Sequence, residues 1–144
     1  MRIRAVKPED PTIAALLQYL QLSALPYDIP IAASHTTTDY WWVAFDDVHP
    51  VAFAALTLSA QWVDTGYLSR AGVLPAYRGQ GLQKKLIKVR ERKAKQLGWK
   101  WLVTDTTDNP PSANNLIDCG FKTFIPSRPW GFDSTIYWKK KLTK

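Results

Sequence analysis

The stretch VLPAYRGQGLQKKLIKVRERKAKQLGWK, residues 73–100, carries the strongest pattern in this chain. It predicts the end of a strand, a turn at Pro75, a loop with two glycines and then a helix over residues 81–97. Leu82, Leu86, Val89 and Leu97 recur at helical steps, so one face of this helix is apolar. The opposite face is basic and carries Lys84, Lys85, Lys88, Arg92 and Lys95.

The start of this helix is a candidate anion site. Free backbone N–H groups and the helix dipole attract negative charge at a helix N-terminus. Gly79 and Gly81 let the main chain approach a phosphate, and Arg78, Lys84 and Lys85 add positive charge. The alternative is an ordinary surface helix with a solvated basic face, and this segment alone leaves both open.

Outward from this stretch, the sequence predicts one domain over residues 1–144. In addition to the basic helix, we expect one helix to begin near Pro11 and another near Ser112. Residues 105–111 are expected to form a polar loop, after which Ser112 is the N-cap or a first-turn residue of its helix. Gly66 and Gly72 are expected at a bulge or a close contact. The order of elements indicates a mixed α/β (α+β) fold around one sheet. The expected strands are residues 2–6, 40–45, 51–59, 62–73, 99–104, 121–125 and 132–139.

Composition narrows the class of protein. The chain has 144 residues, 46% of them hydrophobic, which is typical of a globular domain, and no apolar run is long enough for a membrane span. One cysteine, Cys119, excludes an internal disulfide and favours a reducing cytoplasm, as does the absence of a signal-like apolar run at the start. One cysteine and two histidines predict no structural metal site. The net charge of +7 favours a polyanionic partner: nucleic acid, anionic lipid or a phosphate-rich cofactor.

Two motifs in the chain resemble one protein family. Val73-x-Pro75-x-x-Arg78-Gly79-x-Gly81 is similar to the acyl-CoA pyrophosphate loop of the GNAT superfamily of N-acetyltransferases. About 30 residues downstream, Asp108-Asn109-x-x-Ser112 followed by Gly120-Phe121 resembles the family's asparagine after the fifth strand and the helix that closes on Gly-Phe. The resemblance covers residues 65–121 well, and the first 60 residues match in element order alone.

The resemblance implies a GNAT-like sheet, mostly antiparallel and splayed between its fourth and fifth strands, with helices on both faces. Acetyl-CoA would bind in that gap, with its pyrophosphate on the helix N-terminus and its pantetheine arm along the fourth strand, where a backbone amide can polarise the thioester oxygen. The implied cofactor-binding residues are Ala71, Gly72, Val73, Arg78, Gly79, Gln80, Gly81, Leu82, Gln83, Lys84, Asn109, Ser112 and Asn115.

The chain departs from the family pattern at the positions that handle protons. Leu116 stands where a tyrosine often protonates the departing thiolate, and Gln83 stands where the loop motif ends on Gly or Ala. Asp64 is the single carboxylate on the predicted fourth strand, so no general base is evident. Tyr67 and Ser69, which we place on the same strand face as Ala71 and Val73, are the candidates to hold the amine or a relay water; alternatively, both only pack or cap.

The acceptor is expected to lie between the loops over residues 27–35 and 126–132, at the mouth of the gap. The candidate substrate residues in these loops are Tyr27, His35 and Trp130. A loop tryptophan such as Trp130 can line a substrate pocket, because it combines an apolar body with one N–H donor. His35 could also act as a base, although a lone loop histidine is more often solvated.

The resemblance therefore implies an N-acetyltransferase that uses acetyl-CoA and a primary amine, by direct attack in a ternary complex. The alternative is a basic nucleic-acid-binding module without catalysis, in which the lysine-rich helix grips phosphates. We prefer the enzyme because the phosphate loop and the Asn109 motif occur together. The acceptor is not identified by the sequence, and a homodimer stays open.

Overall fold

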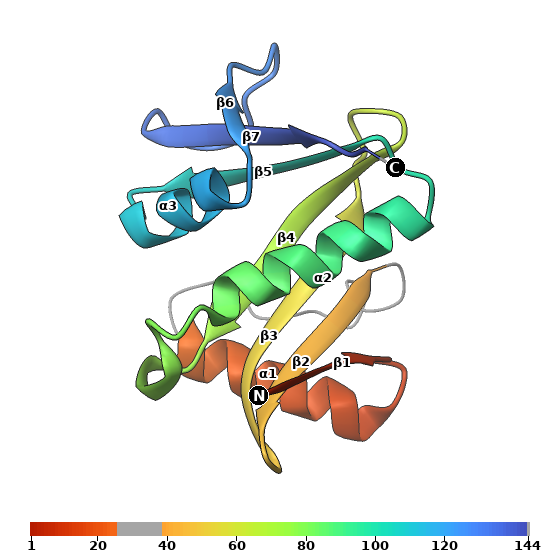
Figure 1. Ribbon diagram of the computed structural model, residues 1–144, viewed down its shortest axis with the longest axis vertical. Helices are drawn as coiled ribbons and strands as arrows, with labels where there is room; N and C mark the ends of the chain where they lie inside the picture. The colour runs from red at the N-terminus through yellow and green to blue at the C-terminus, as the bar shows by residue number, and fades with distance from the viewer. Residues whose placement is uncertain (26–38, 144) are drawn as a thin grey trace.

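The computed structural model describes residues 1–25 and 39–143. Seven described strands form one sheet in the order β1-β2-β3-β4-β5-β7-β6 (Figure 1). The β4–β5 pair is parallel and all other neighbouring strands are antiparallel. No described helix is long and apolar enough to cross a membrane. The elements are β1 (Arg2–Val6), α1 (Pro11–Ala24), β2 (Tyr40–Asp46), β3 (His49–Leu58), β4 (Thr65–Val73), a 3₁₀ turn (Pro75–Tyr77), α2 (Leu82–Gln96), β5 (Trp101–Thr107), α3 (Pro110–Asp118), β6 (Lys122–Phe124) and β7 (Thr135–Lys141).

The alternation of side chains along β2 and β3 divides the hydrophobic core into two layers. On one face, Trp41, Val43 and Phe53 pack against Leu17 and Leu20 of α1. On the other face, the larger cluster joins alternate residues of the same strands to the apolar stripe of α2 and to α3. Helices therefore cover both faces of the sheet, as the resemblance implied, and α2 crosses the face toward the viewer in Figure 1.

The sheet is split between its two parallel strands. β4 and β5 pair from Thr65 to Tyr67 and from Trp101 to Val103, although both strands continue well beyond that point. Where the ladder stops, the Thr104 hydroxyl donates to the Leu68 carbonyl at 3.0 Å. The expected gap between the fourth and fifth strands is thus present, and its vertex is closed by a side chain.

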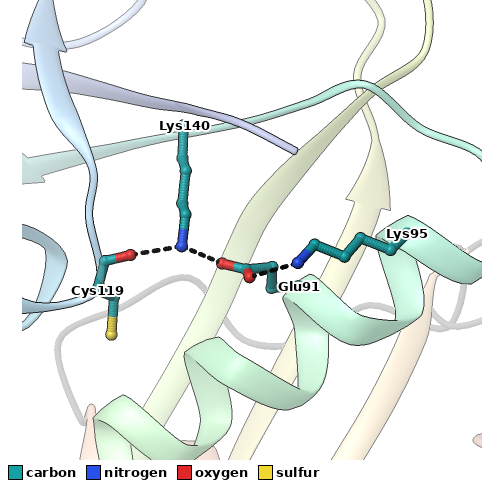
Figure 2. A network of polar contacts seen from close by, with 4 residues as sticks. All are labelled: Glu91, Lys95, Cys119 and Lys140. Atoms are coloured by element: carbon teal, nitrogen blue, oxygen red, sulfur yellow. Dashed lines mark hydrogen bonds and ion pairs between the residues drawn. The ribbon is translucent and has the colours of Figure 1, made fainter. Parts of the chain in front are cut away.

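A partly buried ionic network ties the two halves of the split sheet together (Figure 2). Lys140 of β7 reaches Glu91 of α2 at 2.6 Å and also donates to the carbonyl oxygen of Cys119, which follows α3, at 2.7 Å. Lys95 contacts the other oxygen of the same carboxylate at 3.2 Å. Burial acts to raise the pKa of Glu91, but the hydrogen bonds from the two lysines outweigh it and hold that pKa below its ordinary value.

The structure corrects several expected boundaries. β5 begins at Trp101 and runs through Thr107, so residues 105–107 form strand and not the expected polar loop. Their backbones pair with β7 from Thr135 to Tyr137, a contact that is distant in sequence. α3 begins at Pro110, and its N-cap is Asn109 and not Ser112. Ser112 lies in the first turn of the helix, which was the second of the two expected positions. β4, β6 and β7 also begin later than expected, at residues 65, 122 and 135.

Candidate active site

Backbone conformation leaves the N-terminus of α2 open. Gly81 is the N-cap in the left-handed region (φ 80°) and no side chain caps the helix. Gly79 has the same conformation (φ 79°), and a Cβ added at either glycine would meet nothing within 4 Å. No described acceptor binds the N–H groups of Leu82, Gln83 and Lys84. The left-handed conformation therefore favours glycine at both positions, and the first N–H groups of α2 are left without an acceptor in the described part of the chain.

Two of the three cations expected at this helix end, Arg78 and Lys84, already have partners. The Arg78 guanidinium donates from Nε to the Val73 carbonyl at 3.2 Å and from Nη2 to the Ala24 carbonyl at 3.1 Å. Lys84 lies 2.8 Å from Asp118 of α3 in an exposed ion pair. Arg78 thus ties the loop to the ends of β4 and α1, and the anion-binding capacity of the site rests mainly on backbone N–H groups.

The loop, the free edge of β4 and the start of α3 enclose one cavity of about 660 Å³. Asn109 lies at its rim, where its side-chain oxygen accepts from the Ser112 N–H at 3.2 Å, so the amide NH₂ stays available as a donor. Gln80 and Lys84 are not among the lining residues. The structure brings together the other sequence-predicted cofactor residues, namely Ala71, Gly72, Val73, Arg78, Gly79, Gly81, Leu82, Gln83, Asn109, Ser112 and Asn115.

A smaller cavity of about 190 Å³ continues from there into the gap between β4 and β5. It shares Ala71, Gln83 and Asn115 with the outer cavity. Leu116, in the place of the family's tyrosine, lines it with an apolar side chain. Asp105 also lines it, so an acidic residue lies at the gap.

The floor of this inner cavity holds a buried cation. The guanidinium of Arg90 donates to the carbonyl oxygens of Leu86 at 3.1 Å and Ala55 at 3.2 Å. Burial lowers the pKa of Arg90 to about 9, and no described carboxylate forms an ion pair with it. The two carbonyl contacts fix α2 to β3 beside the gap.

A β-bulge turns Tyr67 to the opposite face of the sheet from the one expected. The register between β3 and β4 shifts between Ala55 and Thr57. Leu68 and Val73 consequently lie in the same core as α2, although a regular strand would place them on opposite faces. The predicted common face of Tyr67 and Ser69 with Ala71 and Val73 is therefore wrong, because the extra residue of the bulge reverses the alternation between them.

Tyr67 and Ser69 both point to the α1 side of the sheet. The Ser69 hydroxyl oxygen accepts from the Thr57 hydroxyl at 2.9 Å. The Tyr67 hydroxyl donates to Oδ2 of Asp105 at 2.6 Å. Burial raises the pKa of Tyr67, and its hydrogen bond to the Asp105 carboxylate raises that pKa further. Tyr67 therefore stays protonated at neutral pH and acts as a donor, not as a base.

Asp105 supplies the carboxylate that the sequence did not reveal near the gap. Its Oδ2 accepts two hydrogen bonds, from Tyr67 and from the indole N–H of Trp130 at 2.8 Å. The sequence pattern WLVTDTT continues the alternation of the strand through residue 105, and that signal could have placed Asp105 on the same face as Trp101 and Val103.

Trp130 joins the loop between β6 and β7 to this face. Its ring packs edge-to-face against Tyr137, Trp62 and Tyr67, with centroids 4.6, 5.9 and 6.3 Å away. Trp130 is 37% exposed, so part of this fixed ring faces solvent. Tyr27 and His35, the other candidate substrate residues, lie outside the described part of the chain.

Possible metal ligands do not gather in the described residues, because no three or more His, Cys, Asp or Glu side chains lie together there. The arrangement is instead an open set of backbone donors at the N-terminus of α2, connected through the sheet gap to a carboxylate held by a tyrosine and a tryptophan.

Comparison with known proteins identifies relatives of this arrangement. The model of the acetyltransferase (GNAT) family matches residues 11–121, whereas no curated protein matches the chain. A putative acetyltransferase of the GNAT family from Desulfovibrio desulfuricans superposes with a TM-score of 0.78 at 15% identity, covering 99% of this chain and 100% of that one.

Two similar structures hold the cofactor or its product. A putative acetyltransferase from Salmonella typhimurium, solved with acetyl-CoA, has a TM-score of 0.75 at 19% identity, covering 100% of this chain and 95% of that one. A Bacillus subtilis acetyltransferase in complex with CoA has a TM-score of 0.75 at 15% identity, covering 99% of both chains. At these identities the likeness concerns the fold.

Proposed function

Because this chain belongs to the acetyltransferase (GNAT) family, we propose that it transfers an acetyl group from acetyl-CoA to a primary amine in a ternary complex. The observation that carries this proposal is the pair of adjoining cavities, with shared lining residues, that lead from the uncapped N-terminus of α2 into the gap between β4 and β5. Its outer part suits an extended polyanion, and its inner part ends beside a carboxylate.

The cofactor's pyrophosphate would lie on the free N–H groups of Leu82, Gln83 and Lys84, where the helix dipole adds positive potential. The free edge of β4 at residues 71–73 offers backbone groups to the pantetheine arm, and Asn109 offers its amide NH₂. The bound acetyl-CoA supplies an activated thioester. A backbone N–H of the same strand can then stabilise the charge that develops on its carbonyl oxygen.

Proton transfer would fall to Asp105 and Tyr67. An ammonium group must lose one proton before its lone pair can attack the thioester carbon, and Asp105 is the carboxylate that lines the inner cavity. As the C–N bond forms and the C–S bond breaks, the nitrogen loses a second proton and the thiolate gains one. One proton is therefore released per turnover, and with an apolar Leu116 the thiolate would receive its proton from water or through Tyr67.

Ser69 would play a positioning part. Its hydroxyl is fixed by Thr57 on the face where the amine arrives, and it lines the inner cavity beside Arg70 and Asp105. It can hold the attacking amine or a relay water, as can the Tyr67–Asp105 pair.

A thermal-shift experiment with acetyl-CoA tests the cofactor site. Ligand at 100 times its Kd stabilises a folded protein by about 2.7 kcal/mol. For a chain of this size that corresponds to a rise in Tm of roughly 5–11 °C. Gly81→Asp should abolish the rise, because it places a negative charge in front of the N–H groups of α2.

Gly98 provides a matched control at the other end of the same helix. It shares the left-handed conformation (φ 78°) and the empty surroundings of Gly81. Gly81→Asn and Gly98→Asn should therefore have similar small effects on the unliganded Tm, while only the first weakens acetyl-CoA binding. If the wild-type protein shows no shift with saturating acetyl-CoA but binds mixed oligonucleotides in a salt-dependent way, the nucleic-acid alternative replaces the enzyme.

A further inference from the structure

The Asp105 carboxylate is held with one oxygen unoccupied. Both hydrogen bonds that it accepts, from Tyr67 and Trp130, go to Oδ2. Oδ1 accepts no hydrogen bond from a described residue, and no described lysine or arginine forms an ion pair with Asp105. A carboxylate oriented by two donors, with an oxygen free, is a binding site for a cation that carries its own N–H donors.

Both donors to this carboxylate belong to a cluster of packed aromatic rings. Trp130 contacts Tyr67, Trp62 and Tyr137, and Phe124 adds a further ring that packs on Trp62 and Tyr137. Because the indole N–H is bound to Asp105 and the ring edges are packed, Trp130 is held in place before any ligand arrives. Aromatic faces attract ammonium groups, and rigid rings bind apolar groups with little loss of entropy.

Asp105 also stands between two cavities. It lines the inner cavity of the strand gap, where the thioester is proposed to lie. Its two hydrogen-bond donors, Tyr67 and Trp130, line a second cavity of about 240 Å³ whose other walls include Leu58, Trp62 and Val103. An ammonium group on Asp105 would thus face the gap, while the body attached to it would extend into a mostly apolar pocket.

We propose that the acceptor is a small hydrophobic primary amine, bound as its ammonium ion on Oδ1 of Asp105 with its apolar body against Trp130 and Trp62. This inference rests on the proposed acetyl transfer and names the class of its acceptor. The pocket selects for a positive charge next to an apolar group, and it selects against a carboxylate beside the amine, which would face the Asp105 charge. Arg70 also lines the inner cavity and donates to Gln21 at 3.3 Å.

Binding measured without turnover tests this class of acceptor. The protein is saturated with CoA, so that no acetyl group can be transferred, and compounds are titrated in by calorimetry. 2-Phenylethylamine has both the cation and the ring; 2-phenylethanol lacks the charge, ethylamine lacks the ring and phenylalanine adds a carboxylate. We expect 2-phenylethylamine to bind at least about ten-fold more tightly than each of the other three.

Paired variants separate the contribution of the charge from that of the ring. Asp105→Asn should remove most of the preference for 2-phenylethylamine over 2-phenylethanol, whereas Asp10→Asn, the same charge change at the N-cap of α1, should not. Trp130→Ala should weaken 2-phenylethylamine about ten-fold and ethylamine less, because ethylamine has no ring to lose its contact with Trp130. Phe132→Ala, a 78% exposed aromatic in the same loop, is its control.

The outcomes distinguish this inference from the proposed function. If CoA binds but 2-phenylethanol or phenylalanine binds as tightly as 2-phenylethylamine, the acceptor class is wrong while the acetyltransferase proposal stands. Unchanged amine binding in Asp105→Asn also overturns the inference. If CoA itself does not bind, the proposed function fails first, and the amine titration in the absence of CoA still reports whether the aromatic pocket binds a cation.

Discussion

The two lysines on Glu91 should differ in their contribution to stability, although they bind the same carboxylate. The Lys140–Glu91 contact is 2.6 Å long and both side chains are mostly buried, with 26% and 16% exposed. Lys95 is 40% exposed and lies one helical turn from Glu91, at 3.2 Å. Exposed pairs contribute about 0.2–1 kcal/mol, whereas breaking a fully buried pair costs about 3–5 kcal/mol.

From these environments we expect Lys140→Met to lower the free energy of unfolding by about 2 kcal/mol and Lys95→Met by about 0.5 kcal/mol or less. Lys140→Met also removes the hydrogen bond to the Cys119 carbonyl. The pair itself is therefore isolated by a double-mutant cycle with Glu91→Gln, in which we expect a coupling energy of about 1–2 kcal/mol. Urea unfolding followed by circular dichroism measures each variant.

The same network predicts a pH dependence of stability. The folded protein holds the pKa of Glu91 below its ordinary value, so the contribution of this carboxylate is complete above its unfolded pKa of about 4.3. It is lost as the pH falls through the lower, folded pKa. The stability difference between wild type and Glu91→Gln should thus be constant near pH 7 and shrink below about pH 4. A coupling to Lys95 as large as that to Lys140, or a difference that does not change with pH, would refute this account.

Three further changes probe the gap and its surroundings. Asp105→Asn should reduce kcat/KM for an acceptor amine by about 10²–10⁴ at pH 7. The loss should shrink toward about pH 9.5, because more of the amine is already neutral there. A loss that is independent of pH contradicts the role of Asp105 as the base. Gly66→Ala should lower the free energy of unfolding in urea by about 1–3 kcal/mol, because the added Cβ would lie 2.7 Å from the Trp99 ring. Unchanged stability would mean that the ring moves freely. Thr104→Val should lower the free energy of unfolding by about 1–2 kcal/mol, because it removes the hydrogen bond to the Leu68 carbonyl at the vertex of the gap. Unchanged stability would show that the vertex does not need this bond.

The geometry of the proposed cofactor site could be predicted largely from local sequence. A glycine loop followed by a strongly periodic helix determines its own geometry, because positive φ at Gly79 and Gly81 and the uncapped end of α2 are properties of neighbouring residues. The close approach expected at Gly66 and Gly72 is also present, since a Cβ at Gly72 would lie 2.8 Å from Phe53. The order of strands and helices followed from periodicity in the same way.

The geometry of the proposed acceptor side could not be predicted in this way, because tertiary contacts decide it. The bulge in β4 depends on pairing with β3, and one extra residue there reverses the face on which Tyr67 lies. Asp105 looked like a loop residue because DTTD is a polar run, yet backbone pairing with Tyr137 keeps it in a strand. Its hydrogen bonds to Tyr67 and Trp130 span 38 and 25 residues of sequence. Local sequence thus determined the geometry of the site at which we propose that a polyanion binds, since that site is built from consecutive backbone groups. Only the folded sheet brought a carboxylate and its aromatic neighbours together, because no pattern along the chain encodes contacts between such distant strands.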